Sequence, residues 1–289
     1  MAEGVSTMAE STHTELSLIS PAQVAEQVPA RQSPNGIRFA SFAENGVAAQ
    51  DLERMVQAVP TLIAAALIRK TYYFVPLAIA EGRAAQPASQ PTGRRTSHDD
   101  TMISPAYTSE LAELAICHRN VDLPAAPGSK QISEGVFISS RLLSDRFSLA
   151  FEFFINVGHA FVDTAGVPEA FSTLAWNQAL ADTRGETSQD AWEFRVLALT
   201  GGENPKPATQ DGRPRIDEKS KNEFLEAAFA DAVAIYLLSL TVDFDYSELR
   251  EREYPLLAPQ ALAERLRLIA RLFPPNPSYE FSIRYRRRA

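Results

Sequence analysis

Six polar side chains recur at helical spacing inside an otherwise apolar stretch from Ser144 to Thr164. They step by three or four residues and therefore share one side of a helix. The six are Asp145, Ser148, Glu152, Asn156, His159 and Asp163. Because most other positions are apolar, the stretch predicts a buried helix with one polar seam. The seam is either a solvent-facing strip or the lining of a cleft, where buried polar groups need partners and often perform chemistry.

Acid–base catalysis is one chemistry that this seam could support. The imidazole of His159 could act as a general acid or base, oriented by Glu152, by Asp163 or by an acid of the later apolar stretch 221–240. Burial among Phe side chains would shift the pKa values of such groups. The acids of that later stretch are Glu223, Glu226 and Asp231. The candidate catalytic residues are His159, Asn156, Glu152, Glu223 and Glu226.

Two other places combine residue types that could bind metal or act as nucleophiles. Cys117 and His118 are sequence neighbours, so a catalytic pair would need the fold to bring their side chains together. His98 precedes Asp99 and Asp100 in a polar loop, and adjacent residues converge on a metal only through a specific turn. We expect a part-buried Cys with a surface His in the first place and a solvated loop in the second.

The elements before the seam helix alternate between helix and strand patterns. Residues 51–68 predict a helix capped by Asp51 and interrupted at Pro60. The β-branched and aromatic run 71–80 predicts a buried strand in which Pro76 marks a bulge, an edge or an end. A polar loop follows over 81–104. Residues 109–120 fit a helix or a strand, and 134–142 predict a strand that leads into the seam helix.

The elements after the seam helix are mainly helical. Residues 169–182 and the Ala-rich run 221–240 predict helices, whereas residues 192–200 fit a helix or a strand. An amphipathic helix at 259–273 stops at Pro274, and a possible short strand and a basic tail follow it.

Composition excludes several classes of protein. The chain has 289 residues and a formal net charge of −8, which argues against a general nucleic-acid binder. Its single cysteine excludes an intramolecular disulfide framework. No apolar run is long enough for a membrane span. The polar N-terminus lacks the pattern of a cleaved Sec signal peptide, so we expect a cytoplasmic protein or one exported by another route.

The seam helix resembles the active-site helix of zincin metallopeptidases. Their H-E-x-x-H motif supplies two zinc ligands and a general base, and the matching positions here are Ile155-Asn156-Val157-Gly158-His159. The run NEFLEAAFADAVAIYL looks like the segment that carries the third ligand, a Glu, in gluzincins. The order of elements over about 50–245 is similar to the catalytic domain of the anthrax toxin lethal factor type. The remnant ligand positions would then be His159, Glu223 and Glu226.

This resemblance implies an α+β, zincin-like metalloprotease fold that is rich in helices and has a small mixed sheet. We expect a disordered or loosely attached leader over 1–35 and a zincin-like domain over 36–250. Residues 251–289 should supply an amphipathic helix and a basic tail packed on the same domain.

The departures from the motif predict a change of function. Ile155 cannot bind zinc, and Asn156 cannot accept a proton from water near neutral pH, so we expect no zinc and no other cofactor. The first hypothesis is a pseudoenzyme whose retained cleft binds a peptide or protein. The second is a non-peptidase enzyme that uses His159 and nearby carboxylates. The third is an active zinc peptidase with unorthodox ligands such as His98 or His118.

Overall fold

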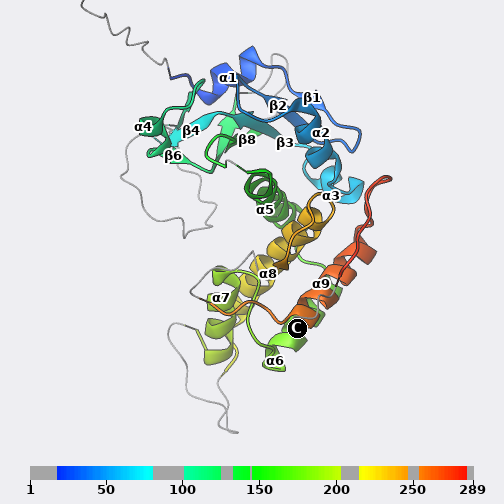
Figure 1. Cartoon of the computed structure of the whole chain (residues 1–289). Coiled ribbons are helices and arrows are strands. Elements are labelled where there is room, and N and C mark those ends of the chain that lie inside the picture. Colours follow the sequence, from blue (N-terminus) through cyan, green and yellow to red (C-terminus); the bar gives the residue numbers. More distant parts are fainter. Residues whose placement is uncertain are drawn as a thin grey trace, which may run out of the picture.

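The structure is a computed structural model of the chain (Figure 1). It describes residues 18–80, 101–124, 133–143, 145–202, 215–246 and 254–284. Within these ranges the fold is α+β, with a small mixed sheet at one end of the molecule and a group of helices at the other. No helix in these ranges is long and apolar enough to cross a membrane.

The larger sheet has five strands, and its three central strands run parallel. An antiparallel strand closes each side, so the sheet is mixed. In spatial order the strands are β1 (Arg31–Gln32), β2 (Arg38–Ser41), β3 (Lys70–Val75), β8 (Ser133–Ser139) and β7 (His118–Leu123). A second, antiparallel sheet contains β5 (Thr101–Ser104), β4 (Leu77–Ala80) and β6 (Ala115–Ile116). Pro76 separates β3 from β4, as the predicted end of a strand.

Helices cover both faces of the larger sheet and form the rest of the molecule. The N-terminal helices are α1 (Pro21–Gln27), α2 (Ala49–Gln57), α3 (Thr61–Ala66) and α4 (Ser109–Ala112). The C-terminal helices are α5 (Arg146–Ala165), α6 (Glu169–Leu180), α7 (Gln189–Thr200), α8 (Glu218–Ser239) and α9 (Pro259–Leu272). The segment 192–200, which the sequence left open, is therefore helical.

The seam helix is α5, and it lies between the sheet and the other helices (Figure 1). Its ring of Phe153 packs edge-on against Tyr72 of β3, with the ring centroids 5.0 Å apart. Phe153 and Phe154 are fully buried in one core that extends from the sheet through α5 to α8 and α9. A smaller core on the opposite face of the sheet contains Val24 of α1. The prediction of a buried helix at this position is confirmed.

Several sequence boundaries were wrong. The expected leader extends too far, because residues 18–35 already contain α1 and β1, while residues 1–17 lie outside the described part. A capping box at Ser20 starts α1. This motif is a sequence signature of a helix start, and it is present although the segment is polar in composition. Residues 101–104, expected in a loop, form β5 because they pair with β4.

Two smaller expectations also need correction. Ala48 is the residue that precedes α2, and Asp51 lies in the first turn instead of capping it. Residues 279–284 form no strand, and Tyr279 instead donates its hydroxyl to the carbonyl of Arg54. The preceding helix α9 packs against α8 and α6, where Tyr236 donates its hydroxyl to the carbonyl of Phe273.

Candidate functional site

The exposure of the polar seam differs along α5. Asp145 caps the helix by accepting from the backbone N–H of Ser148 at 2.8 Å, and both Asp145 and Asp163 are exposed. Glu152 and His159 are partly buried, and Asn156 is buried. The seam therefore opens to solvent at its two ends and passes under other elements in its middle.

The middle of the seam meets the edge strand β7. Nδ1 of His118 lies 2.5 Å from a carboxylate oxygen of Glu152. Asn156 donates its amide to the backbone carbonyl of Glu152 at 2.8 Å and to its carboxylate at 3.4 Å. These contacts join two predicted candidates, Glu152 and Asn156, to His118. The sequence had suggested His118 as a partner of Cys117 or as an unorthodox metal ligand, but not as a partner of Glu152.

Cys117 lies beside this cluster but is not activated by it. Partial burial of the thiol and, after it, the negative charge of Glu152 raise the pKa of Cys117. A nucleophilic cysteine needs the opposite shift, toward the thiolate. The sequence predicted a part-buried Cys117 beside a surface His118. Both residues are exposed, although the thiol itself is partly desolvated, so the prediction is confirmed only for His118.

His159 faces a different set of partners at the crossing of α5 and α8. Gly158 makes this crossing close: a Cβ atom at this position would lie 2.5 Å from the carbonyl oxygen of Ala230. The next residues on the two helices, His159 and Asp231, are thereby brought into electrostatic interaction. Asp190, in the first turn of α7, also interacts with His159.

Asp231 is a buried carboxylate whose hydrogen-bond partners are neutral. It accepts a hydrogen bond of 2.9 Å from the hydroxyl of Thr187 and another from Ser188. Burial raises the pKa of Asp231, although both hydroxyls and the charge of His159 act in the opposite direction. Burial and the nearby Glu193 likewise raise the pKa of Asp190. A raised carboxyl pKa is what a proton donor or acceptor near neutral pH requires.

Glu223 and Glu226, the third-ligand candidates that the gluzincin resemblance implied, are not the acids that meet His159. Glu223 is partly exposed and lies 3.5 Å from Nζ of Lys219, and Glu226 is exposed. The acid that meets His159 on α8 is Asp231, one turn or more further along. The sequence signal for it was a carboxylate in the middle of an apolar helix, but that signal could not specify which face of α8 meets α5.

Zinc does not fit the donors that the fold brings together. Ile155, at the position of the first ligand, packs against the hydrophobic core. The side chain of Asn156 is committed to Glu152. Among the described residues, no group of three or more His, Cys, Asp or Glu side chains could hold a metal ion. His98, with Asp99 and Asp100, lies outside those residues.

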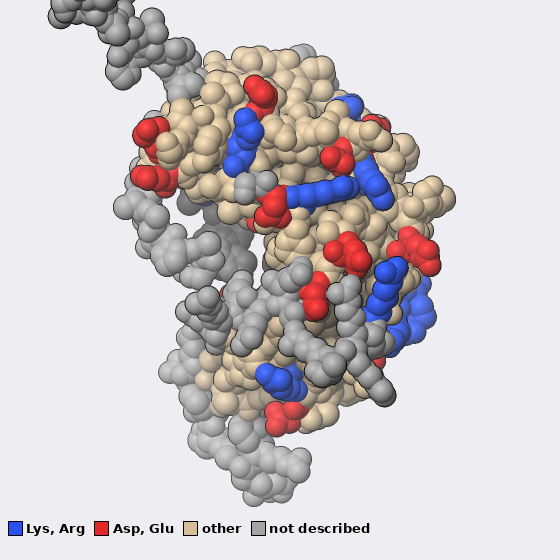
Figure 2. All heavy atoms as spheres, in the orientation of Figure 1, with Lys and Arg blue, Asp and Glu red and all other residues tan. Residues whose placement is uncertain are grey.

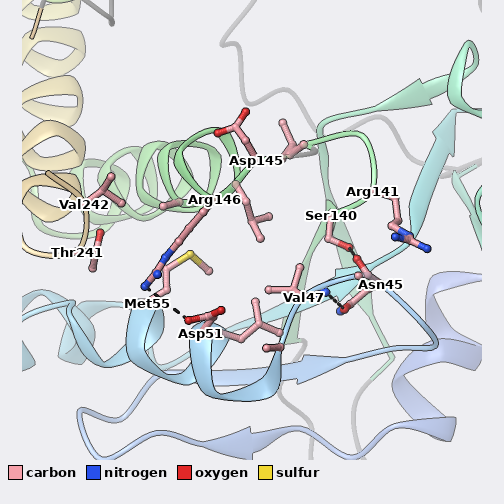
Figure 3. A pocket seen from close by; sticks show the side chains of 16 residues that line it. Asn45, Val47, Asp51, Met55, Ser140, Arg141, Asp145, Arg146, Thr241 and Val242 are labelled. Atoms are coloured by element: carbon pink, nitrogen blue, oxygen red, sulfur yellow. Dashed lines mark hydrogen bonds and ion pairs between the residues drawn. The ribbon is translucent and has the colours of Figure 1, made fainter. Parts of the chain in front are cut away.

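A cavity of about 260 Å³ lies at the other end of α5 (Figure 3). Of the seam residues, only Asp145 lines it. None of the catalytic candidates predicted from the sequence takes part, so the cavity is a second candidate site.

Comparisons of the chain with family models, curated proteins and solved structures give no match. The resemblance to the lethal factor type therefore stays a prediction. On the face drawn in Figure 2, acidic and basic side chains of the described residues are interspersed, without a broad patch of one sign. That the chain does not bind nucleic acid also stays a prediction.

Proposed function

We propose that this chain binds an extended peptide or protein segment along β7, with the polar seam of α5 as the adjoining wall. We call this the β7–α5 surface and define it by His118, Asn120, Ser148, Glu152 and Asn156. Binding here involves no zinc peptidase chemistry. The observation that carries the proposal is an antiparallel edge of the sheet on which no strand of the described residues lies, beside a partly buried carboxylate.

The hydrogen bonds of β7 determine which of its backbone groups face outward. Within the described residues, β7 pairs with β8 on one side only. The N–H of Ser139 donates to the carbonyl of Cys117, so these two residues form a hydrogen-bonded pair. Hydrogen-bonded pairs alternate along an antiparallel ladder, and the peptide groups of His118 and Asn120 therefore point away from β8. An incoming strand uses such outward groups to extend a sheet.

The side chains of the same residues make the surface specific. His118 and Asn120 pair in register with Ile138 and Val136 of β8 and thus lie on the same face of the sheet. Ile138 and Val136 are buried in the core that contains α5, whereas His118 and Asn120 are exposed. The helix therefore covers β8 and leaves the polar face of β7 open, next to Glu152. A bound segment would find backbone partners along β7 and, beside them, the Glu152–His118 pair and the exposed amide of Asn120.

A pair of substitutions at one position tests the backbone part of this proposal. Peptide ligands are first selected from a random display library, and their affinity is measured by fluorescence anisotropy. Asn120→Pro removes one outward backbone N–H, and an edge strand tolerates a proline at such a position. Asn120→Ala keeps that N–H and removes only the side chain. We expect Asn120→Pro to weaken binding about tenfold or more and Asn120→Ala to weaken it about threefold or less.

Equal affinities of the wild type and Asn120→Pro, with unchanged melting temperatures, would exclude strand addition at β7.

Metal analysis of the purified protein tests the other part of the proposal, that binding at this surface involves no zinc peptidase chemistry. Stoichiometric zinc that disappears in His159→Ala, together with EDTA-sensitive proteolysis, would contradict it. Restoring Ile155→His with Asn156→Glu should create zinc affinity if α5 corresponds to the zincin helix.

The environment of His159 favours a second candidate function, general acid–base catalysis without a metal. Its basis is the buried, hydroxyl-bonded Asp231 with a raised pKa beside an imidazole. The test is a panel of chromogenic ester, amide and phosphate substrates, assayed with the wild type and with Asp231→Asn. This candidate requires a turnover that falls about a hundredfold in the variant. No turnover by the wild type, or equal turnover by both proteins, would exclude it.

A further inference from the structure

The cavity at the N-terminal end of α5 is built where the parallel strands end (Figure 3). The loop after β2 and the loop after β8 supply one side, and the first turns of α2 and α5 supply another. Residues 241 and 242, directly after α8, complete the wall. The carboxyl ends of parallel strands are where open α/β sheets usually bind ligands. The cavity is distinct from the β7–α5 surface, which lies further along α5.

The interior of the cavity presents mainly apolar side chains to a ligand. Leu52, Met55, Leu149 and Ala150 line it and are buried. Two buried polar residues also line it, but their hydrogen bonds are directed into the protein. Asn45 donates to the hydroxyl of Ser41 and to the carbonyl of Phe74, and it accepts from the N–H of Val47. A ligand body that fills this space therefore has to be mainly apolar.

The deep Ser140 is likewise already bonded. Its hydroxyl lies 2.7 Å from the carbonyl oxygen of Asn45 and 2.9 Å from that of Val75, and it has one proton to donate. Its backbone N–H donates to the same carbonyl of Val75. The side-chain donors of Asn45 and Ser140 are thus used within the protein, and we expect polar recognition of a ligand at the charged side chains of the mouth.

Charged side chains stand at the mouth. Arg146 extends from α5 across to Asp51 of α2, with Nη2 and the carboxylate oxygen 3.6 Å apart (Figure 3). Both side chains are about half exposed, and such pairs contribute roughly 0–1 kcal/mol. Arg146 can therefore leave Asp51 for a ligand at little cost. Arg141 lies against Gly46 and makes no ion pair with a described residue.

We propose that this cavity binds a small amphipathic monoanion, with its apolar body inside and its acidic group at Arg146. The volume of about 260 Å³ lies below the range of roughly 300–1,000 Å³ that drug-sized ligands occupy, so the ligand is short. Asp51 and Asp145 also line the cavity and repel any anion, a dianion about twice as strongly as a monoanion, so we expect the ligand to carry a single negative charge. A short-chain carboxylate has the required size, charge and apolar body.

Isothermal titration with octanoate tests this proposal, with octan-1-ol and octylammonium as controls of equal chain length. We expect octanoate to bind, and octylammonium to bind about tenfold more weakly or not at all. Arg146→Gln should reduce the preference for octanoate over octan-1-ol to about threefold or less. Arg141→Gln is the matched variant that tests whether the second guanidinium contributes.

Filling the cavity tests the location of the site. Ala150→Leu places a larger side chain in the interior, and Val242→Trp narrows the wall at a partly exposed residue that packs against the edge of the core. Each should weaken octanoate about tenfold or more. The proposal is overturned if the wild type does not bind octanoate at millimolar concentration, or if a folded Val242→Trp protein binds it unchanged. It is also overturned if octylammonium binds as well as octanoate.

Discussion

Among the described residues, two buried carboxylates lie in the helical half of the molecule, and they differ in the charge of their hydrogen-bond donors. Glu186 is fully buried and accepts from Arg265 at 2.8 and 3.2 Å and from Arg195 at 3.2 Å. Asp231 is nearly as buried, but its hydrogen-bond donors are the neutral hydroxyls of Thr187 and Ser188. The positive charge that lowers the pKa of Asp231 comes from His159. The imidazole of His159 carries this charge only when it is protonated.

This difference distinguishes a carboxylate paired with arginines, Glu186, from one bonded only to hydroxyls, Asp231. Glu186 links the loop before α7 to α9 through Arg265 and to α7 through Arg195, so its charge is compensated and its position fixed. Asp231 is left with its desolvation only partly compensated. Carboxylates in that condition gather at sites that exchange protons or bind ligands. The comparison therefore predicts that Glu186 serves stability, whereas Asp231 is a candidate for the proposed acid–base chemistry, and each prediction can be tested by substitution.

The largest effect is expected at the paired carboxylate. Glu186→Gln removes the carboxylate that pairs with the buried Arg265 and leaves the buried Arg195 with only the exposed Asp182, 3.8 Å away. We expect it to lower the free energy of unfolding by about 3–5 kcal/mol. Urea denaturation monitored by circular dichroism measures the loss. Glu193→Gln, at an exposed acid of α7, is the control and should change stability by about 0.5 kcal/mol or less. A loss below about 1 kcal/mol for Glu186→Gln would remove the distinction between the two carboxylates.

The sequence predicted most of the elements because their local patterns and tertiary roles agree. The β-branched and aromatic run 71–80, predicted as one strand, forms β3 and, after Pro76, β4 of the second sheet, and the long apolar helices became α5 and α8. The pattern failed where pairing with distant residues decides the structure. β5 is a strand through its partner β4, and β1 adds to the sheet through Phe39 and Arg38 of β2. Neither partner can be read from the segment itself.

The site was predicted in part, for a related reason. Helical spacing alone identified Glu152, Asn156 and His159 as one seam on α5. It could not identify Asp231, because the register of α8 against α5 is determined by the close approach of Gly158 to Ala230. It could not identify the cavity either, since chain segments that are far apart in sequence build its wall. Spacing predicts what shares a helix face, but not what lies opposite it.

A smaller effect is expected at the helix crossing that brings His159 to Asp231. In Gly158→Ala the new Cβ would lie 2.5 Å from the carbonyl oxygen of Ala230, so one helix has to shift. We expect a loss of about 1–3 kcal/mol from overpacking, reduced by the better helix propensity of Ala. NMR titration of the Asp231 carboxyl should also show a higher pKa than in the wild type, because His159 moves away. Unchanged stability together with an unchanged titration would mean that the crossing does not position this pair.

The smallest effect at pH 7, and the one of opposite sign, is expected for Asp231→Asn. Burial raises the pKa of Asp231 in the folded protein, so the folded state holds a proton that the unfolded state has released. The stability of the wild type must therefore fall as pH rises from about 4 through the raised pKa. The fall amounts to about 1.4 kcal/mol for every tenfold by which folding increases the proton affinity of the carboxylate. Asn cannot ionise, so the variant lacks this fall and becomes the more stable protein above that window.

Urea denaturation of both proteins from about pH 4 to about pH 8 measures this difference directly, because the range begins near the ordinary pKa of an Asp carboxyl. The exposed Asp163→Asn, on the same α5 seam, is the control and should change the free energy of unfolding by about 0.5 kcal/mol or less. If Asp231→Asn instead lost as much stability at neutral pH as Glu186→Gln, the charge of Asp231 would be structural. The hydroxyls of Thr187 and Ser188 would then be its sufficient partners, and the case for acid–base chemistry at His159 would fail with it.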